Sequence, residues 1–328
     1  MTSAIRRQVL AACAGALMAP QVGADEKTRR LAILTVLPPA ESKPYLDALY
    51  DGLRERGWIE GRNLIVDLRY TNGQPSQVSA ATAELLALKP DVFHAALDYV
   101  AKAAAESANP PPIIFAVGND PVGLGLVKSL ARPGTKVTGL SAQNYELVPK
   151  RLSLLKEALP TLVKVGVLEY GRSSPGADNL TRLSQAAATL GLELLHSRVD
   201  SADALEPEFK RWASQGVRGF MNVPNIWFAQ GDGLQQVAAP ALKYRIATCY
   251  SITPAADAGL LMSYSVDFID LYRRSAKLVD QVLKGGNPAE IPVEQANVYE
   301  LVLNQRTAQA IGIVFPRTLL FRATRVVD

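Results

Sequence analysis

The feature that most constrains the fold is a repeat: from residue 31 onward, the chain runs twice through the same order of short apolar and longer amphipathic segments. Matching landmarks lie at a nearly constant offset: residue 31 to 163 is 132, Gly57 to Gly191 is 134, residue 91 to 217 is 126, and residue 113 to 246 is 133. Apolar strands that alternate with helices are typical of parallel sheets covered on both faces. The repeat therefore predicts an α/β fold of two doubly wound parallel-sheet lobes joined by a hinge.

Several elements have readable boundaries. Leu31 to Leu37 reads as a buried strand, and the helix after it ends at Gly57. Ser76 is expected to cap a helix with an apolar face that includes Val78 and Leu85. Further strands are expected at 91–96, 113–117 and 136–140, and in the second half at 163–168 and 192–195.

The first 24 residues are expected to form a signal peptide. Arg6 and Arg7 precede an uncharged stretch, and Val22-Gly23-Ala24 ends just before charge returns at Asp25. Two alternatives stay open: a lipoprotein cleavage box that would place a lipid on Cys13, and a twin-arginine signal. Cleavage after Ala24 leaves Cys249 as the lone cysteine, so the core must hold the fold without a disulfide.

Composition excludes several classes of function. The chain has 328 residues, is 48% hydrophobic, and carries a net charge of +4 that is spread along its length, so a nucleic-acid footprint is not visible. With two Cys and two His, it cannot assemble a multi-Cys or multi-His metal cage, and we expect no metal and no cofactor. His94 and His196 are expected in core or edge positions. The Gly123-Leu124-Gly125 segment is an incomplete dinucleotide motif, because Lys128 stands at the third glycine position.

Ligands of doubly wound sheets bind beyond the carboxyl ends of the strands. The polar and aromatic residues there favour a small organic molecule with polar ends. The candidate ligand-binding residues are Pro39, Asp98, Tyr99, Asn119, Asp120, Tyr170, Arg172, Ser173, Asn222, Asn225, Tyr250 and Asp267.

Each candidate also has a structural interpretation. Asp98 can cap a helix at 100–108, Asp120 can cap a helix that starts at Pro121, and Asp267 can cap the helix at 268–284. Tyr170 and Tyr250 can cover sheet edges. Arg172 with its neighbouring serines suits a carboxylate but equally suits a solvated loop.

Three blocks of sequence resemble one known family. They are Gly52-Leu53 with Gly57-Trp58-Ile59-Glu60-Gly61-Arg62-Asn63, the run from Asn119 through Gly139, and the run from Asp270 to Asn304. The chain resembles, from about residue 30 to its end, the exported substrate-binding proteins of ABC transporters that include tryptophan- and tyrosine-binding members. Members usually have Gly-Gly where Gly134-Thr135 stands and often Tyr-Gly where Tyr264-Ser265 stands, which puts only local backbone geometry in question.

The resemblance implies a type I periplasmic binding fold with two Rossmann-like lobes and a ligand between them. We expect one lobe to comprise 29–142 plus about 268–290, and the other 143–267 plus about 291–328. The implied function is a periplasmic receptor that delivers a small amino-acid-like or aromatic acid ligand to a membrane permease, and we expect it to be a monomer. The alternative is a sensory receptor that reports its ligand to a signalling partner. An enzyme that uses Asp98 or Asp120 as general base is disfavoured, because the motifs do not supply a nucleophile, a base and a group to orient the base.

Overall fold

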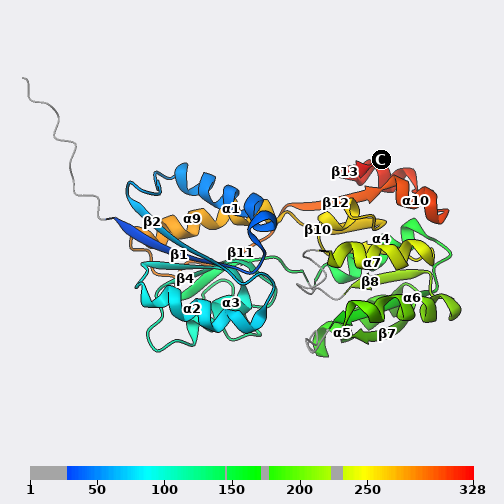
Figure 1. The fold of residues 1–328 in the computed structure, drawn as a ribbon, viewed down its shortest axis with the longest axis horizontal. Helices are drawn as coiled ribbons and strands as arrows, with labels where there is room; N and C mark the ends of the chain where they lie inside the picture. Colours follow the sequence, from blue (N-terminus) through cyan, green and yellow to red (C-terminus); the bar gives the residue numbers. More distant parts are fainter. Residues whose placement is uncertain (1–27, 145, 171–176, 223–231) are drawn as a thin grey trace, which may run out of the picture.

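The computed structural model describes residues 28–144, 146–170, 177–222 and 232–328. They form two α/β lobes that lie side by side, each built around one sheet (Figure 1). The first sheet has the strand order β11-β5-β4-β3-β1-β2 and the second has the order β13-β12-β10-β9-β8-β6-β7. The predicted α/β fold of two doubly wound lobes is confirmed.

The elements of the first lobe come from two stretches of chain. They are β1 (Arg29–Thr35), α1 (Pro39–Arg54), β2 (Leu64–Tyr70), the 3-10 turn η1 (Pro75–Gln77), α2 (Val78–Ala87), β3 (Val92–Leu97), α3 (Asp98–Ala105), β4 (Ile113–Gly118), β5 (Val137–Ser141), and later α9 (Phe268–Leu283) and β11 (Glu294–Gln295). The helix after β1 ends where expected, with Gly57 at φ +87°. Ser76 was expected to cap α2, but this residue lies inside η1 and α2 has no side-chain cap.

The second lobe repeats the plan. It contains α4 (Val148–Ala158), β6 (Lys164–Tyr170), α5 (Ala177–Thr189), β7 (Glu193–Val199), η2 (Ala202–Ala204), α6 (Leu205–Ser214), β8 (Gly219–Asn222), α7 (Gly233–Lys243), β9 (Ala247–Tyr250), α8 (Pro254–Asp257), β10 (Met262–Val266), β12 (Tyr299–Asn304), α10 (Gln305–Ile311), α11 (Arg317–Arg322) and β13 (Arg325–Val327).

One strand pair departs from the all-parallel prediction, because β10 and β12 are antiparallel. The chain leaves β10 at its carboxyl end, which faces the first lobe. It then passes through α9 and β11 and returns to the second sheet beside that same end of β10. A strand that enters from there can only run back along β10. The short strand β11 pairs with β5 in the first sheet, so the last crossing falls after Gln295 and later than the expected position near residue 290.

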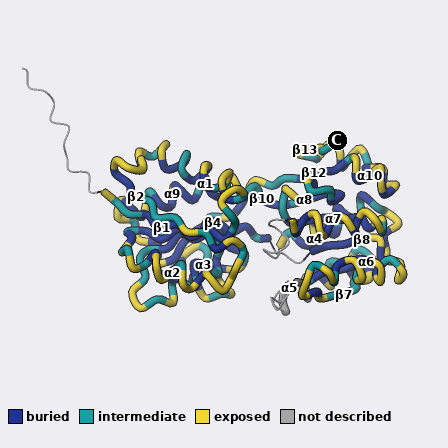
Figure 2. Tube along the Cα trace, in the orientation of Figure 1, coloured by how far each residue is buried: buried dark blue, intermediate teal, exposed yellow. Residues whose placement is uncertain are grey.

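Both sheets are buried between helices, and the strands form the dark interior of each lobe in Figure 2. One cluster in the first lobe lies between its sheet and the helices α1 and α9, and a second lies on the other face against α2 and α3. Two further clusters cover the faces of the second sheet. None of the described helices is long and apolar enough to cross a membrane.

The sequence blocks that carry the family resemblance contact one another in the first lobe. Gly52 lets α1 approach α9, because a Cβ there would lie 2.7 Å from the Arg273 carbonyl oxygen. Trp58 donates its indole N–H to Asp280 Oδ1 at 2.8 Å. Gly139 faces Phe115, whose carbonyl oxygen would lie 2.2 Å from an added Cβ. The residues that carry the family resemblance therefore mainly hold the helices and strands of the first lobe together.

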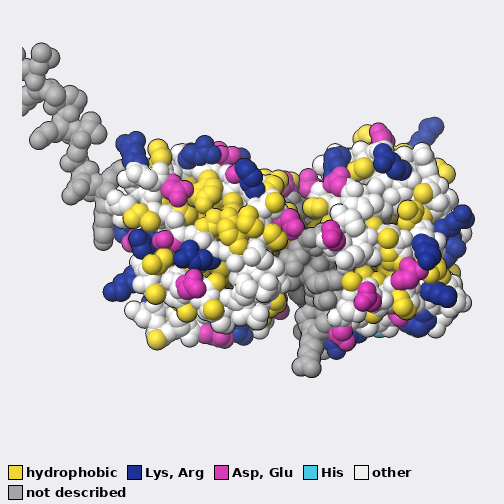
Figure 3. Space-filling model, viewed as in Figure 1, with side chains coloured by type: hydrophobic (Ala, Val, Ile, Leu, Met, Phe, Trp, Pro, Cys, Tyr) yellow, Lys and Arg dark blue, Asp and Glu magenta, His cyan; other side chains and the backbone are white. Residues whose placement is uncertain are grey.

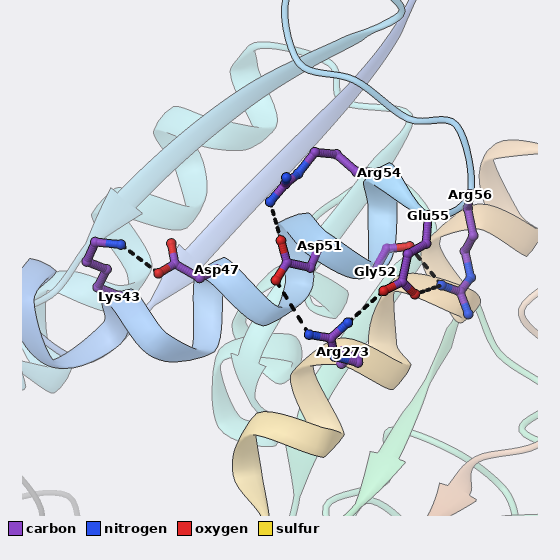
Figure 4. A network of polar contacts seen from close by, with 8 residues as sticks. All are labelled: Lys43, Asp47, Asp51, Gly52, Arg54, Glu55, Arg56 and Arg273. Carbon is purple, nitrogen blue, oxygen red and sulfur yellow. Dashed lines mark hydrogen bonds and ion pairs between the residues drawn. The ribbon is translucent and has the colours of Figure 1, made fainter.

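Charged side chains reinforce the same helix pair at the surface. Arg273 of α9 reaches across to Asp51 at 3.4 Å and to Glu55 at 2.7 Å, both on α1 (Figure 4). Asp51 is also paired with Arg54 within α1. These groups are solvent-exposed, so each pair stabilises the contact only slightly, whereas the apolar face beneath them supplies most of the free energy.

Candidate functional site

The carboxyl ends of the parallel strands in both lobes face the region where the lobes meet (Figure 1). Each half carries the loops that follow its parallel strands at this same end of its sheet. The chain passes between the lobes three times, between β5 and α4, between β10 and α9, and between β11 and β12. The loops at strand ends and the crossing segments together define the candidate ligand site.

Asp98 ties two strand ends of the first lobe together. Its carboxylate accepts the backbone N–H groups of Tyr99 at 2.9 Å, Asn119 at 2.6 Å and Asp120 at 3.1 Å. The side chain is buried, and burial raises the pKa of Asp98 while the three N–H donors oppose that rise. The sequence predicted Asp98 as a possible cap of this helix, whereas it is the first residue of α3 and its carboxylate binds backbone N–H groups of two strand ends.

Asp120 is the exposed acid at the end of β4. Its Oδ1 accepts the Gly123 backbone N–H at 2.8 Å, and a Cβ on Gly123 would lie 2.1 Å from the carboxylate. The segment after Pro121 is a series of turns, so the prediction that Asp120 caps a helix is wrong and the residue closes a turn.

Asn119, next to Asp120, has a side-chain oxygen that can accept a hydrogen bond from a ligand. Its Oδ1 is buried, and within the described part of the chain it has no hydrogen-bond partner. A buried amide oxygen without a partner is costly. A donor on a bound ligand would remove that cost.

The two remaining candidates of the first lobe differ in exposure. Pro39 is exposed in the first turn of α1. Tyr99 is half-buried against the core, and burial followed by the charge of Asp98 raises its pKa to about 12. Tyr99 therefore stays a neutral phenol that offers a ring edge and a hydroxyl.

Tyr45 is a residue of this region that the sequence did not single out. It lies on α1 with its ring centroid 5.4 Å from that of Tyr272. Burial, and then the charges of Glu41, Asp267 and Glu300, raise its pKa, so acids from three distant segments converge here. Figure 3 shows acidic side chains where the two lobes meet. No local pattern could have revealed this cluster, because its members are brought together only by the crossings.

Asp267 caps the helix that follows it, which confirms the structural interpretation of this residue. Its Oδ1 accepts the Asp270 N–H at 3.0 Å as the N-cap of α9, and its own N–H is bonded to the Val298 carbonyl at 3.1 Å. Both bonds lie in crossing segments, so Asp267 joins the second and third crossings.

In the second lobe, Asn222 ends β8 and donates its amide to Ser251 Oγ at 3.0 Å. Tyr250 is only 1% exposed and packs in the core, with its ring centroid 6.3 Å from that of Phe220. Tyr250 therefore forms part of the core of the second lobe, and its contact with a ligand stays a prediction. Tyr170 is the last residue of β6, and Arg172, Ser173 and Asn225 lie outside the described residues.

The described residues include no evident metal-ligand cluster, and the described His94 and Cys249 are buried. Among the described residues, no group of three His, Cys, Asp or Glu side chains is placed to hold a metal ion. His94 is buried in β3 with Nε2 2.9 Å from Ser275 Oγ, which confirms its expected core position. Cys249 is fully buried, and burial raises the pKa of its thiol to about 12, so it is a poor nucleophile.

Two lobes with facing strand ends and three crossings define a type I periplasmic binding protein. Residues 33–327 match the family model described as ABC transporter substrate binding protein, and the chain belongs to that family. A relative named "Tyrosine-binding protein" from Clostridioides difficile (strain R20291) is 24% identical over 279 residues, which cover 82% of this chain and 78% of the relative.

Solved structures agree with this assignment. The ABC domain from Streptococcus pneumonia in complex with L-Trp has a TM-score of 0.83 and 25% identity, covering 92% of this chain and 100% of that chain. A conserved domain protein from Vibrio cholerae O1 biovar El Tor has a TM-score of 0.82, 25% identity and the same coverage.

Proposed function

We propose that this protein is the exported receptor of an ABC importer and that it captures an amino acid or related aromatic acid between its lobes. Membership of the substrate-binding family supports the receptor role. The names of two similar proteins, one tyrosine-binding and one solved with L-Trp, support an amino acid with an aromatic side chain.

The observation that carries the ligand class is the pair Asn119 and Asp120 at the end of β4. The buried Asn119 Oδ1, which has no hydrogen-bond partner among the described residues, and the exposed Asp120 carboxylate are neighbouring acceptors, which suit an ammonium group. Tyr99 adds a half-buried ring nearby in sequence and fold. In the second lobe we propose contacts from Asn222, Tyr170, Arg172, Ser173 and Asn225, with Arg172 as partner of the ligand carboxylate. Pro39 borders the same side of the first lobe.

The proposal includes closure of the lobes around the ligand. Each lobe supplies only part of a polar surface, so the ligand gains its full set of contacts when both lobes touch it. That gain offsets the cost of closure, and a permease then recognises the closed form. We further propose that the mature chain begins at Asp25, acts in the periplasm and is monomeric.

Thermal shift with a panel of amino acids and aromatic acids tests the ligand class. A ligand at 100 times its dissociation constant stabilises the folded state by ~2.7 kcal/mol, whereas sugars and inorganic phosphate serve as negative controls. A stabilising sugar with no response to any amino acid would contradict the proposal. Intact-mass measurement of protein from the periplasm tests the start at Asp25, and a lipidated chain from Cys13 would overturn it.

A matched pair of variants tests the site. Asp120→Ala should weaken ligand binding by ~1–3 kcal/mol through loss of the ammonium partner. Glu106→Ala removes an exposed acid at the C-terminal end of α3, away from the strand ends, and should leave affinity unchanged. Small-angle scattering of the wild type should show a smaller radius of gyration with saturating ligand, and an unchanged radius would exclude closure.

A further inference from the structure

Arg151 is a fully buried arginine that holds two crossing segments. It lies on α4 at 1% exposure, and its Nη1 donates to the Asn144 carbonyl at 3.0 Å while Nη2 donates to Asn144 Oδ1. Its Nε donates to the Tyr264 carbonyl at 2.7 Å. Asn144 belongs to the first crossing, and Tyr264 lies on β10 two residues before the second crossing.

The third crossing is linked to Arg151 through Tyr264. The ring of Tyr264 stacks on that of Tyr299, with centroids 6.1 Å apart and planes 18° apart. Tyr299 is the first residue of β12, which follows the third crossing. One guanidinium and one stacked pair therefore connect all three crossings on the side of the second lobe.

This arrangement has a cost that packing alone does not explain. The acceptors of Arg151 in the described ranges are the Tyr264 and Asn144 oxygens, with no carboxylate among them, and burial lowers the pKa of its guanidinium to about 10. A leucine or methionine of similar volume would fill the site without removing a charge from water. The benefit of arginine is its rigid fork, which fixes the direction of several acceptors at once.

On the side of the first lobe, Arg274 of α9 plays the matching part. It donates to Asn297 Oδ1 at 2.9 Å and to the Gln295 carbonyl at 3.1 Å, both at the third crossing. It also pairs with Asp270 and Glu294. Between these anchors only short stretches remain, and one of them contains Gln143, a non-glycine residue with φ +50°. Such a left-handed backbone is strained, so this residue stores conformational energy beside the anchor.

We propose that Arg151 is the positioning residue of the hinge, which binds the first two crossings rigidly to the second lobe. Rotation between the lobes is then confined to the few crossing residues that lie between the first lobe and the two anchored residues, Asn144 and Tyr264. This inference rests on the lobe closure proposed above. By limiting the orientations that the free protein samples, Arg151 raises the fraction that is ready to bind.

The test measures the distance between spin labels on the two lobes without ligand. Labels at Ala83→Cys on α2 and Gln236→Cys on α7 use exposed positions of the mature chain, whose own Cys249 is buried. Arg151→Met should broaden the distance distribution and lower ligand affinity by ~5-fold or more. Arg151→Lys should fall between, because an ammonium keeps the charge but cannot contact Asn144 through two nitrogens.

Two further variants keep the test decisive. Arg322→Met removes a surface guanidinium that pairs with Glu157 in the same lobe, and should leave the distribution unchanged. If Arg151→Met does not fold, Asn144→Ala removes one acceptor with a smaller change in volume and should also broaden the distribution. A folded Arg151→Met or Asn144→Ala variant with a wild-type distribution overturns the inference. The measurement needs no ligand, so failure to find one contradicts the proposed function and leaves this result standing.

Discussion

The two lobes share a plan but use polar residues differently at their strand ends. In the first lobe, the buried Asp98 carboxylate binds three backbone N–H groups and sets two loops in place. In the second lobe, the side chains Asn222 and Ser251 bond to each other, and Tyr250 turns into the core. The first lobe thus carries the most recognisable family motifs, and the contacts of those motifs stabilise the loops and helices of that same lobe. A family resemblance of this kind identifies the fold and says little about the ligand.

The largest expected effect separates a core tyrosine from a site tyrosine. Tyr250→Ala should lower the free energy of unfolding by ~3–5 kcal/mol, because it opens a cavity beside Phe220. Tyr99→Ala, at a half-buried position of the first lobe, should cost roughly half as much. Tyr250→Phe should leave ligand affinity unchanged, as measured by calorimetry, and a large loss of affinity would return Tyr250 to the site.

The second effect is a pH dependence that belongs to the first lobe. Burial lowers the pKa of His94 from 6.5 to about 4, so folding is favoured while the imidazole stays neutral. The contribution is complete above pH 6.5 and is lost as the pH falls toward 4, which amounts to about 3 kcal/mol. Denaturant titrations at several pH values measure this loss.

The same titrations on His94→Gln should show a flatter dependence between pH 6.5 and 4. His196→Gln, which changes a partly exposed histidine of the second lobe, provides the control and should follow the wild type. Equal slopes for wild type and His94→Gln would assign the acid sensitivity to other groups.

A third, smaller effect compares the two acids at neighbouring strand ends. Asp98→Ala leaves three N–H groups without their acceptor and should destabilise the fold by ~2 kcal/mol. Asp120→Ala breaks one exposed turn bond and should cost ~0.5–1 kcal/mol, while it reduces ligand affinity. The reverse order of stabilities would mean that Asp98 is not the residue that holds the loops.

The smallest effect concerns the surface pairs. Arg273→Ala in the first lobe and Arg322→Ala in the second remove exposed ion pairs and should each change the free energy of unfolding by less than ~1 kcal/mol. Chemical denaturation at low and high salt measures both, and salt should diminish the difference. A larger loss for Arg273→Ala would show that the network in Figure 4 secures α9 to α1.

Much of the fold was predictable because it depends on local pattern. Apolar runs, helical spacing and glycine stops fixed the order of strands and helices, and the constant offset revealed the two lobes. Ser76 lies inside η1, and Asp120 bonds locally to the Gly123 N–H in a turn. The error at Asp98 has another cause: a short polar side chain near a helix start can bond to several backbone groups. Which group it bonds to depends on loops that are distant in sequence, as Asn119 is from Asp98.

The sequence by itself determined the two α/β lobes, the membership of the substrate-binding family and the polar residues at strand ends. Tertiary structure alone decided which of those residues are held by the scaffold, since β9 turns Tyr250 into the core and the Asp98 carboxylate is occupied by backbone donors. It also decided the antiparallel course of β12 and the convergence of three crossings on Arg151. The physical reason is that hydrophobic periodicity is a local property, whereas the direction of a side chain and the partner of a buried charge are set by segments that meet only when the chain has folded.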